Sequence, residues 1–223
     1  MKLHWSPRSP FVRKVMIVLH ETGLHDQVEC VRSPVAIQSP PNAAVMADNP
    51  LGKIPTLISA EGMALYDSRV ICEYLDLRSA AGLFPAEPSA RLRHLRWQAL
   101  ADGLTDILLI WRTELSRATG PWEAVTTGWR IKLRAGMRQL EHDADALNAS
   151  PFGIGHVAVI CLLGQLDFRW PDCAWRDHHP RLAALEALLA SRASIQATAV
   201  RNDDGQAGDL TAGHLTFAPG DGG

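Results

Sequence analysis

The sequence predicts an α/β domain followed by an all-helical domain. Over residues 1–78, short strand-like segments alternate with two stretches in which apolar residues recur at helical spacing. Residues 79–89 are rich in small residues and proline, and they predict a linker. From 90 to 198 the apolar residues keep helical spacing, and no strand candidate interrupts them. These observations predict two domains of different class, α/β and all-α.

The first domain begins with a predicted strand and a predicted helix. Residues 1–5 predict the strand. Ser9 is a preferred N-cap residue, and Pro10 fits the first helical position because the N–H group that it lacks would have no partner there. Apolar residues then recur at helical spacing until Gly23 ends the helix.

The rest of the first domain contains strands, a loop and a second helix. The predicted elements are a strand at 28–31, a loop with about one helical turn over 33–50, a hairpin of strands at 54–59 and 63–66, and a helix over 68–78. Pro55 cannot donate to a sheet ladder, so we expect it to open an edge strand or a bend. This order of elements predicts a thioredoxin-like domain.

The second domain contains predicted helices over residues 89–117, 122–147, 154–168 and 181–189. Together they predict a helical bundle. After Thr198 the chain becomes rich in glycine, aspartate and proline. Residues 199–223 are therefore predicted to be a disordered tail.

Composition places the chain among ordinary globular proteins. Of 223 residues, 47% are hydrophobic and 21% are charged, and the formal net charge is −2. So small a net charge gives no electrostatic reason to expect nucleic acid or an acidic membrane as a partner. The beginning of the chain lacks the pattern of a signal peptide, and no apolar run reaches membrane-spanning length. We therefore expect a cytoplasmic protein with no membrane partner.

The cysteines and histidines predict neither a metal site nor dithiol chemistry. The four cysteines are scattered, without a Cys-x-x-Cys pair. His178 and His179 are adjacent in a predicted loop, and His4, His20 and His25 lack the spacing of metal ligands. We therefore expect no metal.

Two segments are suited to bind a small peptide that carries a free acid group. If the Ile54–Pro55 bond is cis, the backbone of Ile54 faces outward and can pair with an extended ligand. Asp67 and Ser68 come directly before an apolar helical repeat, so free N–H groups and a hydroxyl are available there for a carboxylate. The simpler alternative is that Asp67 and Ser68 only cap the helix.

Three segments, in their order and spacing, resemble the glutathione transferase superfamily. They are Ser9-Pro10-Phe11-Val12-Arg13-Lys14-Val15, Asn49 to Leu57, and Tyr66-Asp67-Ser68. The resemblance extends over residues 1–198 and is closest to the bacterial serine-type members. It implies an enzyme that joins the glutathione thiolate to small, partly apolar electrophiles, with glutathione as co-substrate and no metal. It also implies a homodimer.

Within this resemblance, Ser9 is the expected catalytic residue. A free thiol has a pKa of about 8.5, and lowering it by about two units requires roughly 2.7 kcal/mol of preference for the thiolate. One hydrogen bond to a charged group contributes about 1.5–3 kcal/mol, so one hydroxyl at a helix N-terminus suffices. Two alternatives stay open: Ser9 only caps its helix, or Ser6 in the same loop is the donor.

The resemblance also implies how glutathione is bound. The backbone of Ile54, before Pro55, pairs with the cysteinyl part. Ser68 binds the γ-glutamyl carboxylate, and Asp67 binds the amino group. Lys53 neutralises the glycyl carboxylate, unless it is a solvated surface lysine.

The electrophile pocket is expected between the domains, beside the predicted helix over 89–117. Its candidate walls are Trp5, Phe11, Ile107, Trp111 and Leu115. Arg112 is a candidate contact for an anionic substrate. Because apolar residues at helical spacing are more often core residues, each wall residue has a core role as its alternative.

The chain departs from the family at residues 153–156, which read Gly-Ile-Gly-His. The family has a capping box here, a hydroxyl residue followed three positions on by aspartate. Its absence predicts a loss of about 0.5–2 kcal/mol in the stability of the second domain. It also favours the alternative function, a non-catalytic relative of the same fold with a regulatory or structural binding role. Glutathione-linked disulfide reduction would require cysteine where the chain has Ser9.

Overall fold

The computed structural model describes residues 1–203 and 211–218, which divide into two compact units. Of these residues, the first unit contains 1–91 and 192–203, and the second contains 92–191 and 211–218. Residues 192–198, which the sequence grouped with the helical domain, therefore belong to the first unit.

A four-stranded mixed sheet forms the centre of the first unit. Its strands are β1 (Lys2–Trp5), β2 (Glu29–Arg32), β3 (Thr56–Ile58) and β4 (Ala64–Leu65), in the spatial order β2-β1-β3-β4. β1 is parallel to β2 and antiparallel to β3, and β3 is antiparallel to β4. Because β3 is an interior strand, Pro55 does not open an edge strand. It lies in the bend just before β3, where no ladder N–H group is required.

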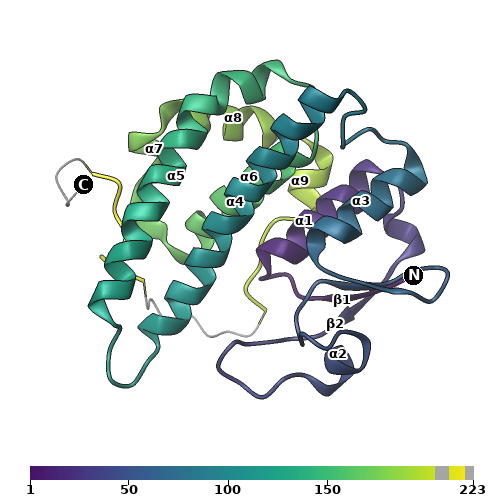
Figure 1. Cartoon of the computed structure of the whole chain (residues 1–223), viewed down its shortest axis with the longest axis horizontal. Coiled ribbons are helices and arrows are strands. Elements are labelled where there is room, and N and C mark those ends of the chain that lie inside the picture. The colour runs from purple at the N-terminus through teal and green to yellow at the C-terminus, as the bar shows by residue number, and fades with distance from the viewer. Residues whose placement is uncertain (204–210, 219–223) are drawn as a thin grey trace. The chain divides into compact units, whose positions relative to one another are not determined.

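Helices cover both faces of this sheet. α1 (Pro10–Glu21) and α3 (Ser68–Ser79) lie side by side on one face, and α2 (Ala43–Asp48) lies on the other (Figure 1). A 3₁₀ turn, η1 (His25–Gln27), links α1 to β2, and α9 (Ala193–Ala197) packs against α1. The fully buried core includes Leu3, Val15, Val18, Leu57 and Ile71. This arrangement confirms the predicted thioredoxin-like domain.

Every regular element among the described residues of the second unit is a helix. The elements are α4 (Pro88–Leu115), whose first turn belongs to the first unit, α5 (Glu123–Ala149), α6 (Ile154–Arg169), η2 (Pro171–Cys173), α7 (Trp175–His178) and α8 (Pro180–Leu189). Helix α6 is apolar and buried on almost all sides, so the other helices pack around it. The prediction of a helical domain after the α/β domain is confirmed.

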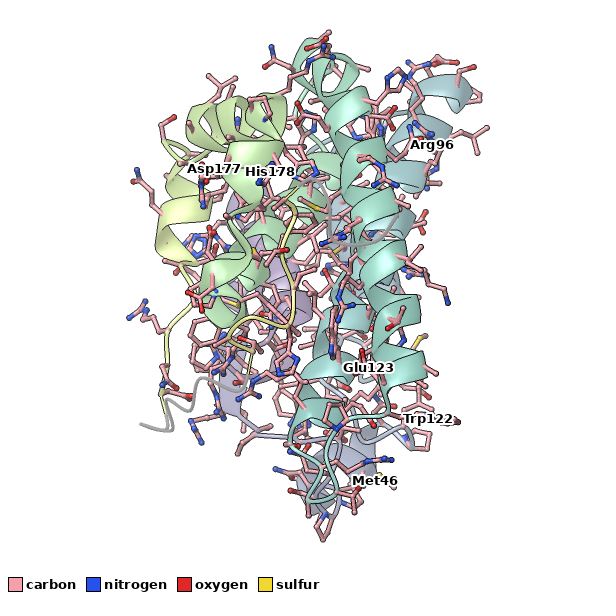
Figure 2. All side chains as sticks on the ribbon, turned by 90° about the vertical axis from the view of Figure 1, so that its left-hand side faces the viewer. Met46, Arg96, Trp122, Glu123, Asp177 and His178 are labelled. Carbon is pink, nitrogen blue, oxygen red and sulfur yellow. The ribbon has the colours of Figure 1, made fainter. Side chains whose placement is uncertain are left out.

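Of the two histidines predicted to lie in a loop, His178 is helical, and His179 is the single residue between α7 and α8. His178 is the last residue of α7, next to Asp177 (Figure 2). His179 is buried, and its Nδ1 donates to the carbonyl oxygen of Trp175 at 2.9 Å. Its ring packs edge-on against Phe217. His179 is thus a core residue with its polar atom satisfied.

The start of α6 has a cap that the sequence did not predict. The Gly153 N–H group donates to Nδ1 of His156 at 3.2 Å, and Nε2 of His156 donates to the carbonyl oxygen of Leu147 at 2.8 Å. The capping interaction that the sequence analysis gave as absent is therefore formed in part, by His156 in the position of the missing aspartate. A neutral imidazole provides the acceptor that a carboxylate would provide, and in addition it ties α6 to the end of α5.

The described residues near the C-terminus are packed against the second unit. Leu215 and Phe217 are buried. Arg134 of α5 donates to the carbonyl oxygen of Thr216 at 2.9 Å. For residues 211–218 this packing corrects the expectation of a disordered tail, because buried apolar side chains and hydrogen bonds to α5 hold the segment.

The remainder of the expected tail has two parts. Residues 199–203 lie against the first unit, where the carboxylate of Asp203 pairs with Arg8. Residues 204–210 and 219–223 lie outside the described residues.

Candidate functional site

The register of the sheet brings three predicted site segments to one end of it. His4 near the end of β1 pairs with Thr56 at the start of β3, and Leu57 pairs with Leu65 at the end of β4. The loop that follows β1, the turn that precedes β3 and the connection that follows β4 therefore leave the sheet at the same end. The first two connections contain Ser9 and Ile54, and the third leads directly to Ser68, the first residue of α3.

Ser9 is the N-cap of α1, as its sequence context predicts. Its Oγ accepts a hydrogen bond from the Val12 N–H group at 3.2 Å. A serine hydroxyl can donate one hydrogen bond in addition to those that it accepts, so capping leaves the hydroxyl proton of Ser9 available for a ligand. The rival donor, Ser6, is buried, and its Oγ accepts from the Arg8 N–H group at 3.5 Å.

The turn before β3 is held by the side chain of Asn49. Nδ2 of Asn49 donates to the Lys53 carbonyl at 3.1 Å and to Oγ1 of Thr56 at 2.9 Å, and Thr56 donates to the same carbonyl at 2.8 Å. The Ile54–Pro55 bond is cis. Ile54 is half-buried and Lys53 is exposed, so the backbone of this turn is fixed while its side chains reach the surface.

The start of α3 provides a capped helix end. Oδ1 of Asp67 accepts from the Arg69 N–H group at 2.9 Å, and the side chain of Asp67 is exposed. Ser68, the first residue of the helix, is buried. Asp67 is therefore a helix cap in this structure, as the simpler alternative predicts. A carboxylate has two oxygens and several acceptor sites, so this cap does not occupy the whole side chain.

The expected walls of the electrophile pocket fall in different environments. Trp5 and Phe11 are half-buried residues of the first unit. In the second unit Trp111 is fully buried, with its ring 4.9 Å from that of Trp170, so its core alternative holds in this structure. The remaining candidates, Ile107, Leu115 and Arg112, are half-buried.

His4 belongs to a polar cluster with Lys2, Asp48 and Ser33. Nε2 of His4 and Nζ of Lys2 both lie against Oδ2 of Asp48, at 2.7 and 2.8 Å, and Nδ1 of His4 lies 2.8 Å from Oγ of Ser33. The hydrogen bond from Lys2, followed by that from His4, lowers the pKa of Asp48. Within residues 1–203 and 211–218, no group of three or more histidine, cysteine or acidic side chains is placed to hold a metal ion. No helix in that part of the chain is long and apolar enough to cross a membrane.

Sequence reasoning missed two contributors to this end of the sheet. Asn49 belongs to the Asn-Pro-Leu-Gly segment that carried the resemblance, and the hydroxyl of Thr56 seven residues later was a usable sign of a side-chain bridge. The segment after α9 also contacts the loop after β1, where the Arg201 N–H group donates to the carbonyl oxygen of Pro7. No local pattern in the polar segment after Thr198 indicates this contact.

Comparisons with known proteins agree with this geometry. The family model described as "Glutathione S-transferase, N-terminal domain" matches residues 8–78. The GST-like protein YibF of Escherichia coli K12 is 35% identical over 204 residues, which cover 89% of this chain and 98% of that protein.

Solved structures extend the similarity to both units. A glutathione transferase family member from Pseudomonas fluorescens Pf-5, crystallised with bound glutathione, is 44% identical with a TM-score of 0.86, and the match covers 90% of this chain and 99% of that one. A second structure from that source holds S-(propanoic acid)-glutathione and matches at 43% identity with a TM-score of 0.82, over the same shares of the two chains. This chain belongs to the glutathione S-transferase family.

Proposed function

We propose that this protein is a glutathione transferase that joins the glutathione thiolate to small, partly apolar electrophiles. The main support is that three segments lie at one end of the sheet: the loop with Ser9, the turn with Ile54 and the start of α3 at Ser68. The bound glutathione of the Pseudomonas relative supports glutathione as the ligand of that end. The bound S-(propanoic acid)-glutathione supports a conjugating enzyme over a protein that binds glutathione alone.

In this proposal Ser9 stabilises the thiolate, and the enzyme is of the serine type. The Ser9 hydroxyl donates to the glutathione sulfur while its oxygen continues to accept from Val12. A hydrogen bond to a charged group contributes about 1.5–3 kcal/mol, which lowers a thiol pKa by about one to two units. The thiolate then attacks the electrophile, forming a carbon–sulfur bond. Any leaving group departs with the electron pair of the bond that breaks.

The other predicted contacts complete the binding of the tripeptide. The Ile54 backbone, before Pro55, pairs with the cysteinyl part. Ser68 binds the γ-glutamyl carboxylate and Asp67 the amino group, and Lys53 neutralises the glycyl carboxylate. The rigid Asn49 bridge supports the first of these roles because it holds the Ile54 turn before ligand arrives.

Three further expectations belong to this proposal. The protein acts in the cytoplasm as a homodimer, as its resemblance implies. Phe11, Ile107 and Leu115 stay candidate walls for the electrophile. Trp111 is fully buried in this structure, so it stays a candidate wall only if ligand binding exposes its side chain.

The test is a pH titration of bound glutathione, followed by thiolate absorbance, in the native protein and in Ser9→Ala and Ser6→Ala. We expect the native protein to hold the thiol pKa below about 8.5, Ser9→Ala to remove the shift while still binding, and Ser6→Ala to retain it. Binding without any shift would favour the non-catalytic alternative. A shift lost only in Ser6→Ala would make Ser6 the donor, and absence of binding would overturn the site.

A further inference from the structure

A small cavity lies in the first unit, beside the loop that leads to Ser9. It measures about 50 Å³ and is open to solvent on one side. Its lining comes from the end of β1 and the loop after it, from α1, and from the end of α9 and the segment after it. The lining residues are Trp5, Ser6, Pro7, Val12, Arg13, Met16, Ala197, Thr198, Ala199 and Arg201.

The segment after α9 is fixed against this loop by an ion-pair clasp. Oδ1 of Asp203 lies 2.9 Å from Nε of Arg8, and Oδ2 lies 2.7 Å from Nε of Arg32. The Arg201 N–H group donates to the carbonyl oxygen of Pro7 at 3.4 Å. The hydrogen bond from Arg32 lowers the pKa of Asp203, so its carboxylate stays ionised at neutral pH. The wall of the cavity that this segment forms is therefore anchored at both arginines.

The cavity has an excess of positive charge. Nε of Arg13 is buried and has no hydrogen-bond partner among the described residues. In the same part of the chain, neither Arg13 nor Arg201 has a carboxylate oxygen within 4.0 Å. The cavity and its clasp together hold four guanidinium groups and one carboxylate. A buried donor without a partner costs about 1–3 kcal/mol, so an anion that reaches Arg13 is favoured.

We propose that this cavity binds a carboxylate group, held by Arg13 and Arg201. A water molecule needs at least about 10–15 Å³ of such volume, so the cavity accommodates a group of a few non-hydrogen atoms. The planar guanidinium fork matches a carboxylate, which accepts two parallel hydrogen bonds. Trp5, Val12 and Met16 supply apolar walls for the carbon that carries it.

Two kinds of ligand could supply this carboxylate: a free small acid, or the electrophile itself. Because Ser6 and Pro7 line the cavity and Ser9 follows in the same loop, we expect an electrophile whose carboxylate is bound there to extend toward Ser9. This second source rests on the proposed function, whereas binding of a free acid does not.

The first arm of the test measures binding of benzoate and its neutral analogue benzamide by calorimetry at low ionic strength. The full chain is compared with Arg13→Gln, Arg201→Gln and the control Arg138→Gln, which removes an exposed arginine of α5. We expect benzoate to bind more tightly than benzamide, and each cavity substitution to weaken benzoate binding roughly tenfold or more. Arg201 is exposed, so its variant is informative even if Arg13→Gln fails to fold. Equal binding of the two probes, or benzoate binding unaffected in both variants, would overturn the site.

The second arm identifies the source of the carboxylate. Glutathione conjugation is measured with 4-chloro-3-nitrobenzoate and 4-chloro-3-nitrobenzamide, where the thiolate forms the carbon–sulfur bond and chloride leaves. A preference for the benzoate of about tenfold in kcat/KM, lost in Arg201→Gln and kept in Arg138→Gln, assigns the cavity to the electrophile. Equal rates, together with arginine-dependent benzoate binding, assign it to a free acid. If neither compound reacts, the proposed function fails while the binding arm still decides on the cavity.

Discussion

One side chain fixes the turn that presents the Ile54 backbone. Asn49 is almost fully buried and makes three hydrogen bonds, to the Lys53 carbonyl, to Thr56 and from the Leu51 N–H group. An extended ligand pairs well with the backbone of this turn only if the backbone groups are already in position. The position of the turn, and not only the identity of Ile54, therefore decides how well this end of the sheet binds a peptide.

We expect Asn49→Ala to weaken both stability and ligand binding. The variant loses three hydrogen bonds of a buried side chain and leaves only the Thr56 hydroxyl to hold the Lys53 carbonyl, which costs about 1–3 kcal/mol in the free energy of unfolding. A displaced Ile54 backbone raises the dissociation constant of glutathione about tenfold, equivalent to about 1.4 kcal/mol. Urea unfolding and calorimetric titration with glutathione measure the two effects. The exposed Asn148→Ala in α5 is the matched control, and unchanged affinity in Asn49→Ala would contradict the positioning role.

At the scale of elements, the start of α6 depends on His156 in place of the expected aspartate. The imidazole accepts from Gly153 and donates to the carbonyl oxygen of Leu147, so it joins the beginning of α6 to the end of α5. We expect His156→Ala to lower the free energy of unfolding by about 1–3 kcal/mol because the buried Gly153 N–H group loses its partner and the link from α6 to the Leu147 carbonyl is lost. Urea unfolding, with the exposed His142→Ala as control, measures this loss. An effect no larger than that of the control would show that the cap is dispensable.

The same helix start makes stability dependent on pH through His94. Burial, then the nearby His156 and then Arg93, lower the pKa of His94 from 6.5 to about 4. Between these values the unfolded chain binds a proton that the folded chain does not, so the free energy of unfolding decreases as the pH falls from about 6.5 to about 4. One such group contributes a slope of at most about 1.4 kcal/mol per pH unit.

We expect His94→Gln to reduce this slope. Lowered pKa values of His20 and His179 give the folded state the same sign of pH dependence, so the relevant quantity is the difference between the variant and the native protein. Unfolding in urea at several pH values between 4 and 7 measures it. A slope that is identical in both proteins would mean that folding does not lower the pKa of His94.

At the scale of the whole molecule, the sequence predicted what periodicity and turn chemistry determine. Ser9 with Pro10 predicted the start of α1, and Asp67 predicted that of α3, because a capping side chain lies next in sequence to the helix that it caps. His156 escaped prediction because its partner, Leu147, lies nine residues away on another helix. The clasp at Asp203 escaped because its two arginines lie 195 and 171 positions earlier in the chain, and nothing local distinguishes a paired aspartate from a solvated one.

The attachment of the C-terminal segment was also not predicted, since it depends on two apolar residues in a polar stretch. Leu215 and Phe217 are buried against the second unit, and the ring of Phe217 packs on His179. Truncating a buried Phe to Ala costs about 3–5 kcal/mol in a closed core, and a terminal segment that can detach loses less. We therefore expect Phe217→Ala to lower the free energy of unfolding by about 1–3 kcal/mol.

Thermal and urea unfolding of Phe217→Ala measure this attachment, and a chain ending at Ala218 is the control because it keeps the whole described segment. We expect the control to unfold like the native protein and a chain ending at Asp203 to lose at least as much stability as Phe217→Ala. If the chain ending at Asp203 is as stable as the native one, the segment contributes nothing to the helical unit. If that shorter chain keeps the benzoate affinity of the native protein, the Asp203 clasp and its cavity are independent of everything that follows them.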